Sequence, residues 1–444
     1  MVTYIEKVLA AVDEARSEIV DFACDLIRIP TVNPPGQHYD VCAHALGSRL
    51  ERLGFDVEYL AAEGRPEHTT RCPRINVVGL WRGQTDHPLL HLNGHLDVVP
   101  PGAGWSVDPF GAVVRDQRIY GRGACDMKAG LAAAVYAAEA VRRAGVPLIG
   151  SLEVSGTVDE ESGGVAGMAW LAERGRIAAA RTDFVVIPEP FSPHRICIGH
   201  RGVHWFEITT FGRTAHGSMP FLGASAIDRL TRVLHALETR LRPALASRVT
   251  AMPVVPPEAR CATMNVNAIK GGQFADARLN QTPCVADRAS AIIDRRFLAE
   301  EGFEEARAEL VRLLDEVASV DPAFGYELED LMVVHPVMTP VDSPLVRRLG
   351  AAIEQITGRR PELVASPGSY DHKHVARLGG IQHCVAYGPG RLELAHQPDE
   401  WCGVADLLQA TKVLALTIVG LVGPRDTNLS PLSNVESVDI PEVS

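Results

Sequence analysis

The chain has 444 residues, and 43 Lys and Arg against 55 Asp and Glu give it a formal net charge of −12. Hydrophobic cores stop growing at about 250–300 residues, so the length indicates at least two domains. An apolar fraction of 46% excludes a largely disordered chain. The acidic balance, without a long run of Lys and Arg, argues against a nucleic-acid partner.

Three further patterns bear on location. Residues 1–21 mix acids and bases at helical spacing and lack the basic head and apolar stretch of a secretory signal. The apolar stretch at 413–423 is too short to cross about 30 Å of hydrocarbon, which predicts a buried core helix and no membrane partner. The nine cysteines are scattered without a CxxC pair. Reduced thiols and a cytoplasmic location are therefore expected.

The first half of the chain alternates strand-like and helix-like segments. Apolar residues at steps of three and four from Val8 to Leu26 predict a helix that ends before the proline-rich residues 30–35. A helix of small residues is predicted at 129–145. The expected strands are 55–60, 74–81, 89–99, 151–158 and 183–190. This alternation is typical of an α/β domain with a central, mostly parallel sheet between helices.

From about Gly199 the order of elements changes to β-α-β-β-α-β, the ferredoxin-like pattern. The segments are strand 202–212, helix 225–241, strands 262–272 and 289–297, helix 303–320 and strand 326–336. Helix–strand alternation then resumes. We expect an α/β domain formed by 1–198 and 339–424, interrupted by an inserted α+β domain at 199–338. A polar tail follows at 425–444.

Histidine and acidic residues follow the predicted strands. The candidates are His95, Asp97, Asp126, Glu160, Glu161, Glu189 and His396. Taken alone, Asp126 could cap a helix and the carboxylates of 159–161 could form a solvated turn. Taken together, they should meet at the carboxyl edge of one sheet, where ligand sites of such domains lie. Two imidazoles and several carboxylates suit zinc, cobalt or manganese, and such a set can bridge two ions.

Six motifs then support a resemblance that covers nearly the whole chain. In order they are NGHLDVVPPG, GRGACDMKAG, TVDEESGG, PEP, GRTAHGSMP and AHQPDE. With them the chain resembles the metallopeptidase family that contains acetylornithine deacetylase, succinyl-diaminopimelate desuccinylase, aminoacylase and glutamate carboxypeptidase. The family fold, a catalytic α/β domain with an inserted lid that dimerises, agrees with the insertion predicted above.

The resemblance implies a centre of two divalent metal ions, zinc first, with cobalt or manganese as alternatives. Asp126 would bridge the two ions. His95 and Glu189 would complete the ligand shell of one ion, and Glu161 and His396 that of the other. The ions would lower the pKa of a bridging water and polarise the carbonyl of the substrate.

The same resemblance implies roles for five further residues. Glu160 would be the general base that takes a proton from the water and returns it to the leaving amine, and Asp97 would orient His95. His216 would reach the active site of the partner subunit and donate a hydrogen bond to the oxyanion. Asn280 and Arg296 would hold the carboxylate of the substrate, although Arg295 is an immediate competitor for Arg296.

One segment departs from the family pattern. Where many members have Gly-Gly-Thr-Asp, this chain has SPGSYDHKH at 366–374. His372, Lys373 and His374 could recognise an acidic group of the substrate, or they could be exposed residues at the start of a helix.

The prediction is therefore a cytoplasmic, homodimeric, two-metal amidohydrolase that cleaves the amide bond of an N-acyl amino acid, a small substrate that carries a carboxylate. A dipeptidase or carboxypeptidase of the same family, or a hydrolase of another small carboxylate-bearing C–N bond, is the alternative. A non-catalytic binding protein on the same scaffold is a third hypothesis, but such a protein has no need of Glu160. An aminopeptidase with a related metal core would not require the GRTAHGSMP segment.

Overall fold

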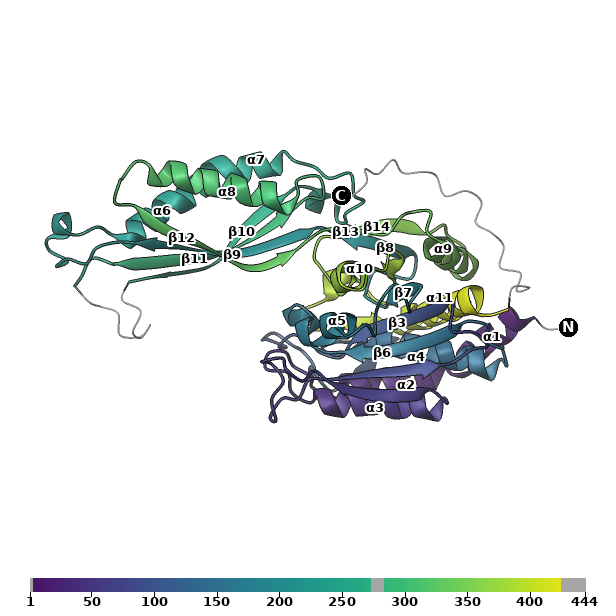
Figure 1. The fold of residues 1–444 in the computed structure, drawn as a ribbon. Helices are drawn as coiled ribbons and strands as arrows, with labels where there is room; N and C mark the ends of the chain where they lie inside the picture. The colour runs from purple at the N-terminus through teal and green to yellow at the C-terminus, as the bar shows by residue number, and fades with distance from the viewer. Residues whose placement is uncertain (1–2, 273–282, 425–444) are drawn as a thin grey trace. The chain divides into compact units, whose positions relative to one another are not determined.

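The computed structural model describes residues 3–272 and 283–424, and the chain forms two units. Of the described residues, unit 1 consists of 3–199, 339–364 and 370–424, and unit 2 consists of 200–272, 283–338 and 365–369. Figure 1 shows both units with their labelled elements.

Unit 1 contains the alternating segments of the sequence. Its strands are β1 Asp56–Ala61, β2 Ile75–Trp81, β3 Leu89–His95, β4 Val113–Arg115, β5 Arg118–Tyr120, β6 Ser151–Thr157, β7 Phe184–Ile187, β8 Arg195–His200, β14 Glu362–Ser366, β15 Cys384–Ala386 and β16 Trp401–Gly403. The last residue of β8 and the last two residues of β14 belong to unit 2. Its helices are α1 Tyr4–Glu14, α2 Arg16–Ile27, α3 Tyr39–Arg52, α4 Lys128–Arg143, α5 Trp170–Glu173, α9 Pro344–Thr357, α10 His372–Arg377 and α11 Val404–Val422. Short helical turns are η1 Glu160–Ser162, η2 Val165–Ala169 and η6 Leu392–Leu394.

The main sheet of unit 1 is mixed and has parallel strands at its centre. Its strands follow the order β1-β2-β6-β3-β7-β15-β8. The pairs β3–β6, β3–β7 and β7–β15 are parallel, whereas β1–β2, β2–β6 and β8–β15 are antiparallel. Every residue of β3 and β6 is buried, as expected where helices cover both faces of a sheet. The carboxyl ends of β6, β3 and β7 therefore lie side by side at one edge.

Helix α4 is the small-residue helix of the sequence, and 14 of its 16 residues are buried. It packs against β3 and β6. A Cβ atom at Gly130 would lie 1.9 Å from the carbonyl oxygen of Pro188. Only glycine permits this close approach, which brings the segment that carries Glu189 onto the first turn of α4.

The predicted N-terminal helix is two helices, α1 and α2, which meet at Ala15. The backbone of Ala15 has φ −83° and ψ 6°, outside the helical region. Both helices pack against α4, so the break lets each of them follow the surface of that helix.

Helix α11 contains the apolar stretch near the C-terminus. By length and composition it could cross a membrane, but 67% of its most apolar window is buried inside the protein. It packs against α4, α9 and α1. These contacts are typical of the core helix of a globular domain, as the sequence predicts.

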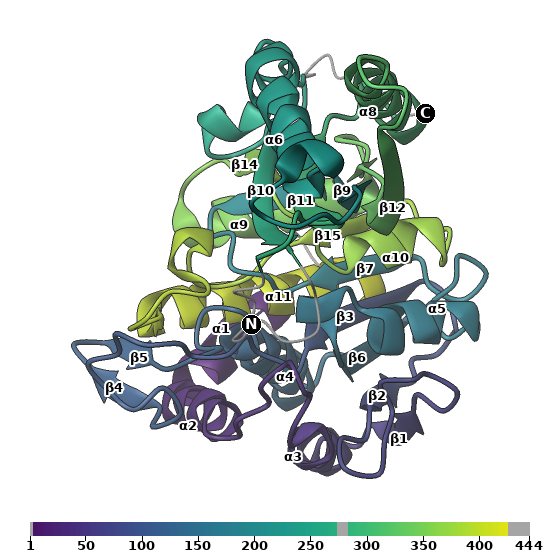
Figure 2. The same ribbon diagram turned by 90° about the vertical axis from the view of Figure 1, so that its left-hand side faces the viewer.

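Unit 2 has the β-α-β-β-α-β order. Its elements are β9 Gly202–Phe211, η3 Pro220–Leu222, α6 Ala226–Ala236, η4 Leu237–Leu241, α7 Arg242–Ala246, η5 Pro257–Arg260, β10 Thr263–Gly271, β11 Arg288–Phe297, α8 Phe303–Ala318, β12 Gly325–Val334 and β13 Val337–Met338. The sheet order β10-β11-β9-β12 with antiparallel pairs is the ferredoxin-like arrangement. Figure 2 shows α6 and α8 side by side on this sheet.

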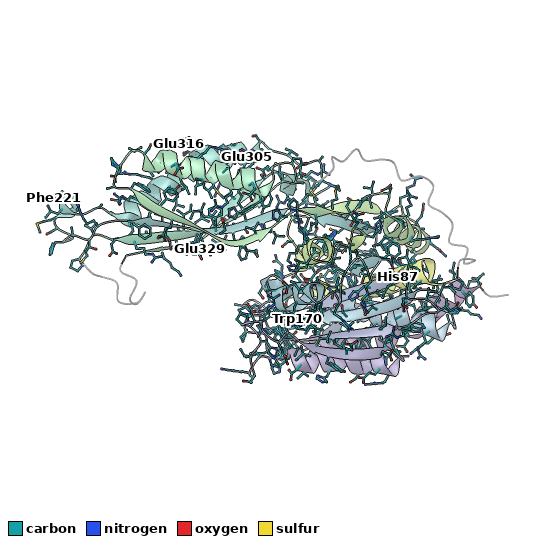
Figure 3. All side chains as sticks on the ribbon, viewed as in Figure 1. His87, Trp170, Phe221, Glu305, Glu316 and Glu329 are labelled. Carbon is teal, nitrogen blue, oxygen red and sulfur yellow. The ribbon has the colours of Figure 1, made fainter. Side chains whose placement is uncertain are left out.

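The core of unit 2 lies between its two helices and its sheet. Leu310 and Leu314 of α8 pack into this core with residues of β9 and β11. Glu305 and Glu316, on the other side of α8, are exposed and labelled in Figure 3. The helix therefore has the apolar stripe and charged face of an amphipathic helix.

The division by sequence does not include Ala365–Ser369 in the inserted domain, but these residues belong to unit 2. The backbone N–H of Ala365 donates to Pro253 over 2.8 Å, and its carbonyl accepts from Val255 over 3.1 Å. Ala365 also packs with Met252 and Val254 in a small apolar cluster. Pairing between residues more than a hundred positions apart gives no local sequence signal.

Candidate metal centre

Four of the predicted ligands come from strand ends and from the start of α4. His95 is the last residue of β3, Glu161 lies in η1 after β6, and Glu189 follows β7. Asp126 lies two residues before the first residue of α4, and the cap residue of that helix is Met127. Since β6, β3 and β7 are neighbours, their carboxyl ends bring these groups together.

Asp126 lies between two groups of donor atoms. Its Oδ1 is 3.0 Å from His95 Nε2, and Glu189 Oε1 is 3.8 Å from the same nitrogen. Its Oδ2 is 3.5 Å from His396 Nε2, which is 3.1 Å from Glu161 Oε2. Within each group of three, the donor atoms lie within 4.8 Å of one another. The side chain of His396 is half exposed. The side chains of the other four candidate ligands are between 1% and 11% exposed.

The electrostatics of the centre are those of an anionic site. Burial raises the pKa of Glu161 to about 7, although a hydrogen bond with His396 acts in the opposite direction and lowers it. Burial also raises the pKa of Glu189, and the charge of Asp126 adds to that shift. Hydrogen bonds with Asp126 and Glu161 raise the pKa of His396 to about 11. The raised pKa values of Glu161, Glu189 and His396 favour protonated forms, and divalent cations would displace those protons. Although burial opposes the shift, hydrogen bonds with both histidines lower the pKa of Asp126, which is therefore ionised. This donor set of two imidazoles and three carboxylates fits two divalent ions.

The three consecutive carboxylates after β6 have three different partners. Asp159 accepts hydrogen bonds from Arg74 Nε over 2.9 Å and from the hydroxyl of Tyr39 over 2.8 Å. Glu160 Oε1 lies 3.3 Å from Lys373 Nζ, and Glu161 faces His396. Asp159 thus has structural partners, Glu161 belongs to one of the two candidate ligand groups, and Glu160 is a carboxylate beside that group.

Asp97 contacts His95 in a way that differs from the expectation. The oxygen 2.9 Å from His95 Nδ1 is the backbone carbonyl of Asp97, and its carboxylate oxygen is 3.7 Å away. The carboxylate instead accepts the backbone N–H groups of Glu160 and Glu161, each over 3.1 Å, and the side-chain amide of Asn33 over 2.9 Å. Asp97 therefore holds both His95 and the η1 turn.

Glu400 is a residue of the centre that the sequence reasoning missed. Its Oε1 accepts the backbone N–H groups of Gly123, Cys125 and Asp126 over 3.1, 2.8 and 3.0 Å. Its Oε2 is paired with Arg122, and both side chains are at most 1% exposed. Glu400 thus fixes the loop that presents Asp126. The sequence does contain a signal for this residue, because Glu400 is the last residue of the AHQPDE motif.

The predicted residues of unit 2 make local contacts. His216 is exposed, and its Nδ1 lies 2.7 Å from the hydroxyl of Ser218 and accepts the backbone N–H of that residue over 3.2 Å. Arg296 pairs with Asp294 through two contacts of 2.8 and 2.9 Å. Arg295 is fully buried and bonded to acidic residues of its own unit. Asn280 lies outside the described residues.

The 372–374 segment is not exposed, and that alternative is wrong. His372 and Lys373 are 1% and 6% exposed, and both begin α10. His374 Nε2 is 2.7 Å from the carbonyl oxygen of Gly163. Burial lowers the pKa of His372 to about 3 and that of His374 to about 4, so both imidazoles are neutral at pH 7.

Fold and site together define a hydrolase with a candidate two-metal centre at the carboxyl edge of a mixed sheet. The family model described as peptidase family M20/M25/M40 matches residues 91–419. The chain belongs to this family. The prediction from the motifs is therefore confirmed, as is that of a hydrolase that acts on C–N bonds.

Relatives and solved structures agree with this assignment. A succinyl-diaminopimelate desuccinylase of Gluconacetobacter diazotrophicus is 31% identical over 423 residues, which cover 93% of this chain and 99% of the relative. Human carnosine dipeptidase 1 is 19% identical with a TM-score of 0.74, over 94% of this chain and 98% of that one. A dinuclear metal-binding M20 peptidase of Bacillus subtilis is 16% identical with a TM-score of 0.64, over 92% and 99%. At these identities the two structures share the fold with this chain.

Proposed function

We propose that the chain is a cytoplasmic, homodimeric deacylase that hydrolyses the amide bond of an N-acyl amino acid with two divalent ions, zinc first and cobalt or manganese as alternatives. The observation that carries this proposal is the position of Asp126, which presents one carboxylate oxygen to each of two histidine-containing groups, beside the separate carboxylate of Glu160. When bound, divalent ions make water more acidic and polarise a carbonyl group.

Each residue of the centre would have a stated part in that reaction. His95, Asp126 and Glu189 would hold one ion, and Asp126, Glu161 and His396 the other. Glu160 would accept a proton from water at its carboxylate and give it to the nitrogen of the leaving amine. Asp97 supports this role, because its carboxylate accepts the backbone N–H of Glu160 over 3.1 Å.

Unit 2 would supply the contacts to the substrate. Since the N–H of Ser218 donates to Nδ1 of His216, the neutral imidazole carries its hydrogen on Nε2. That N–H would donate to the oxyanion that forms from the amide carbonyl, in the active site of the partner subunit. Asn280 and Arg296 would hold the carboxylate of the substrate. Arg296 is the better of the two adjacent arginines, because Arg295 is fully buried.

The relatives favour an N-acyl amino acid as the substrate. Those at about 30% identity over most of the chain carry the name succinyl-diaminopimelate desuccinylase, and that name describes removal of an acyl group from an amino acid. Carnosine dipeptidase 1 shares only the fold at 19% identity. A dipeptide is therefore the second substrate class to test.

The deciding experiment is a turnover screen of the protein loaded in turn with zinc, cobalt and manganese. The substrates are a matched series of N-succinyl, N-acetyl and N-formyl amino acids together with dipeptides. We expect turnover of N-acyl amino acids by the wild type, and turnover lower by about 10³- to 10⁴-fold by Glu160→Gln prepared in parallel. If only dipeptides are turned over, the protein is a dipeptidase and the proposed deacylase activity is wrong. Equal turnover by the wild type and by Glu160→Gln would exclude Glu160 as the base.

A further inference from the structure

The ion pair between Lys373 and Glu160 has no part in the reaction described above. Lys373 Nζ lies 3.3 Å from Glu160 Oε1, with side-chain exposures of 7% and 11%. Among residues 3–272 and 283–424, Lys373 is the one residue that donates a hydrogen bond to the Glu160 carboxylate. A buried ion pair of this kind is costly to desolvate, and removal of one partner leaves an uncompensated buried charge.

The residues on both sides of Lys373 are anchored. Asp371 Oδ2 accepts a hydrogen bond from Asn93 of β3 over 3.0 Å and another from Thr157 of β6 over 3.3 Å. His374 donates to the carbonyl of Gly163, the residue after the η1 turn. These contacts connect the start of α10 to the two strands and to the turn that carry the centre. The backbone of Lys373 is therefore held relative to Glu160.

The turn after Glu160 fits tightly against α10. A Cβ atom at Gly164 would lie 2.7 Å from Asp371 Oδ1 and 3.1 Å from the His374 ring, and its φ of 74° also favours glycine. The turn that follows Glu160 and the start of α10, which carries Lys373, thus pack directly against each other. Asp371 and His374 anchor the 371–374 segment, whereas the side chain of Lys373 points to the carboxylate of Glu160.

Glu160 has reason to move if that ammonium is removed. Its neighbour Glu161 is a predicted ligand, and a free carboxylate beside divalent cations is itself a good ligand. The charge of Glu160 also acts on the buried carboxyl groups of Asp97, Glu189 and Asp371. A base that ligates an ion can no longer accept a proton from water.

We propose that Lys373 is a positioning residue whose ammonium group holds the Glu160 carboxylate in place and keeps it out of the metal-ligand set. This inference rests on the proposed function for the role of Glu160 as base. It differs from recognition of an acidic substrate group by Lys373, which the sequence left open. In that case the ammonium would contact the substrate and Glu160 would keep its position without it.

The first test uses steady-state kinetics of the metal-loaded dimer. Lys373→Met should lower kcat roughly 10²-fold, since a displacement of about 1 Å at a catalytic group can cost that much. KM should stay within about a factor of two, because no binding contact is removed. Lys373→Arg should retain most of the activity, and Lys7→Met, the same change at an exposed position on α1, should equal the wild type. A raised KM for succinyl substrates with kcat unchanged would overturn the proposal in favour of substrate recognition.

The second test needs no substrate and separates this inference from the proposed activity. The visible spectrum of the Co²⁺-loaded protein reports the ligands of the ion. Lys373→Met should change that spectrum, Lys373→Arg should not, and the change should be absent when Lys373→Met is added to Glu160→Gln. Identical spectra for Lys373→Met and the wild type, or a change that persists without the Glu160 carboxylate, would overturn the proposal. Lys373→Gln replaces the apolar variant if that variant fails to fold.

Discussion

The centre of unit 1 and the 212–220 segment of unit 2 hold their histidines in different ways. His95 is 1% exposed and lies between carboxylates that come from other elements, with Asp126 at 3.0 Å. His216 is exposed, and its ring contacts in the described part of the chain are to Ser218, two residues away. Unit 1 thus assembles its candidate ligand groups from its own elements. The ring of His216 is held from its own loop through Nδ1, and its Nε2 is free to donate in the role proposed above.

The largest effect on activity is expected at Glu160, in the centre of unit 1. Glu160→Gln removes the proton acceptor and should lower kcat by about 10³- to 10⁴-fold, within the range that general-base catalysis supplies. The metal content, measured by elemental analysis, should stay that of the wild type, because Glu160 is not in either ligand group. Loss of the metal with the activity would instead make Glu160 a ligand.

The exposed histidine should give the next largest effect. His216→Ala should lower kcat by about 10²- to 10³-fold, the usual cost of removing one oxyanion donor. Mixed dimers of this variant with Glu160→Gln should recover part of the activity, since one site then combines an intact Glu160 with an intact His216. Mixed dimers as inactive as their parents would place His216 in its own subunit's site or outside catalysis.

Glu400 tests whether the loop before α4 is preorganised. Glu400→Gln removes one partner of a buried ion pair and should lower the free energy of unfolding by about 3–5 kcal/mol. Denaturant unfolding measures this change, and calorimetric titration should show weaker metal binding because Asp126 loses its backbone anchor. Exchange of the exposed Glu393 for Gln is the control and should leave both quantities unchanged.

Metal binding should depend on pH in a defined direction. The pKa of Glu161 is about 7 and that of His396 about 11, so at pH 7 protons must leave before either residue can act as a ligand. Affinity should therefore rise with pH, by about tenfold per unit for each proton released. Calorimetry in buffers of different ionisation enthalpy counts these protons. An affinity that does not change between pH 6 and about 8 would contradict the protonated state of the centre.

The smallest effect is expected at Arg296. Arg296→Lys should raise KM about tenfold with little change in kcat, because a bidentate contact to the carboxylate of the substrate is lost. A substrate amide without that carboxylate is the control and should show no such difference. A loss confined to kcat would exclude Arg296 from ground-state binding.

Much of the centre was predictable from local sequence. His95, Glu161 and Glu189 follow buried apolar runs, and such runs end at one edge when the strands are parallel neighbours. The β-α-β-β-α-β order of unit 2 was equally legible, because each of its segments has a clear helical or strand period. The family and its hydrolase chemistry followed from motifs that contain these same residues.

Only the tertiary structure shows which partner each carboxylate after β6 contacts. Asp159, Glu160 and Glu161 are adjacent and chemically similar, yet they pair with Arg74, Lys373 and His396, at separations of 85, 213 and 235 residues. No local pattern encodes contacts over such distances, which is also why the backbone role of Glu400 was missed. The sequence by itself determined the donor set and its place on the sheet. Packing between distant segments determined which partner each of these carboxylates contacts, because each contact joins parts of the chain that are far apart in sequence.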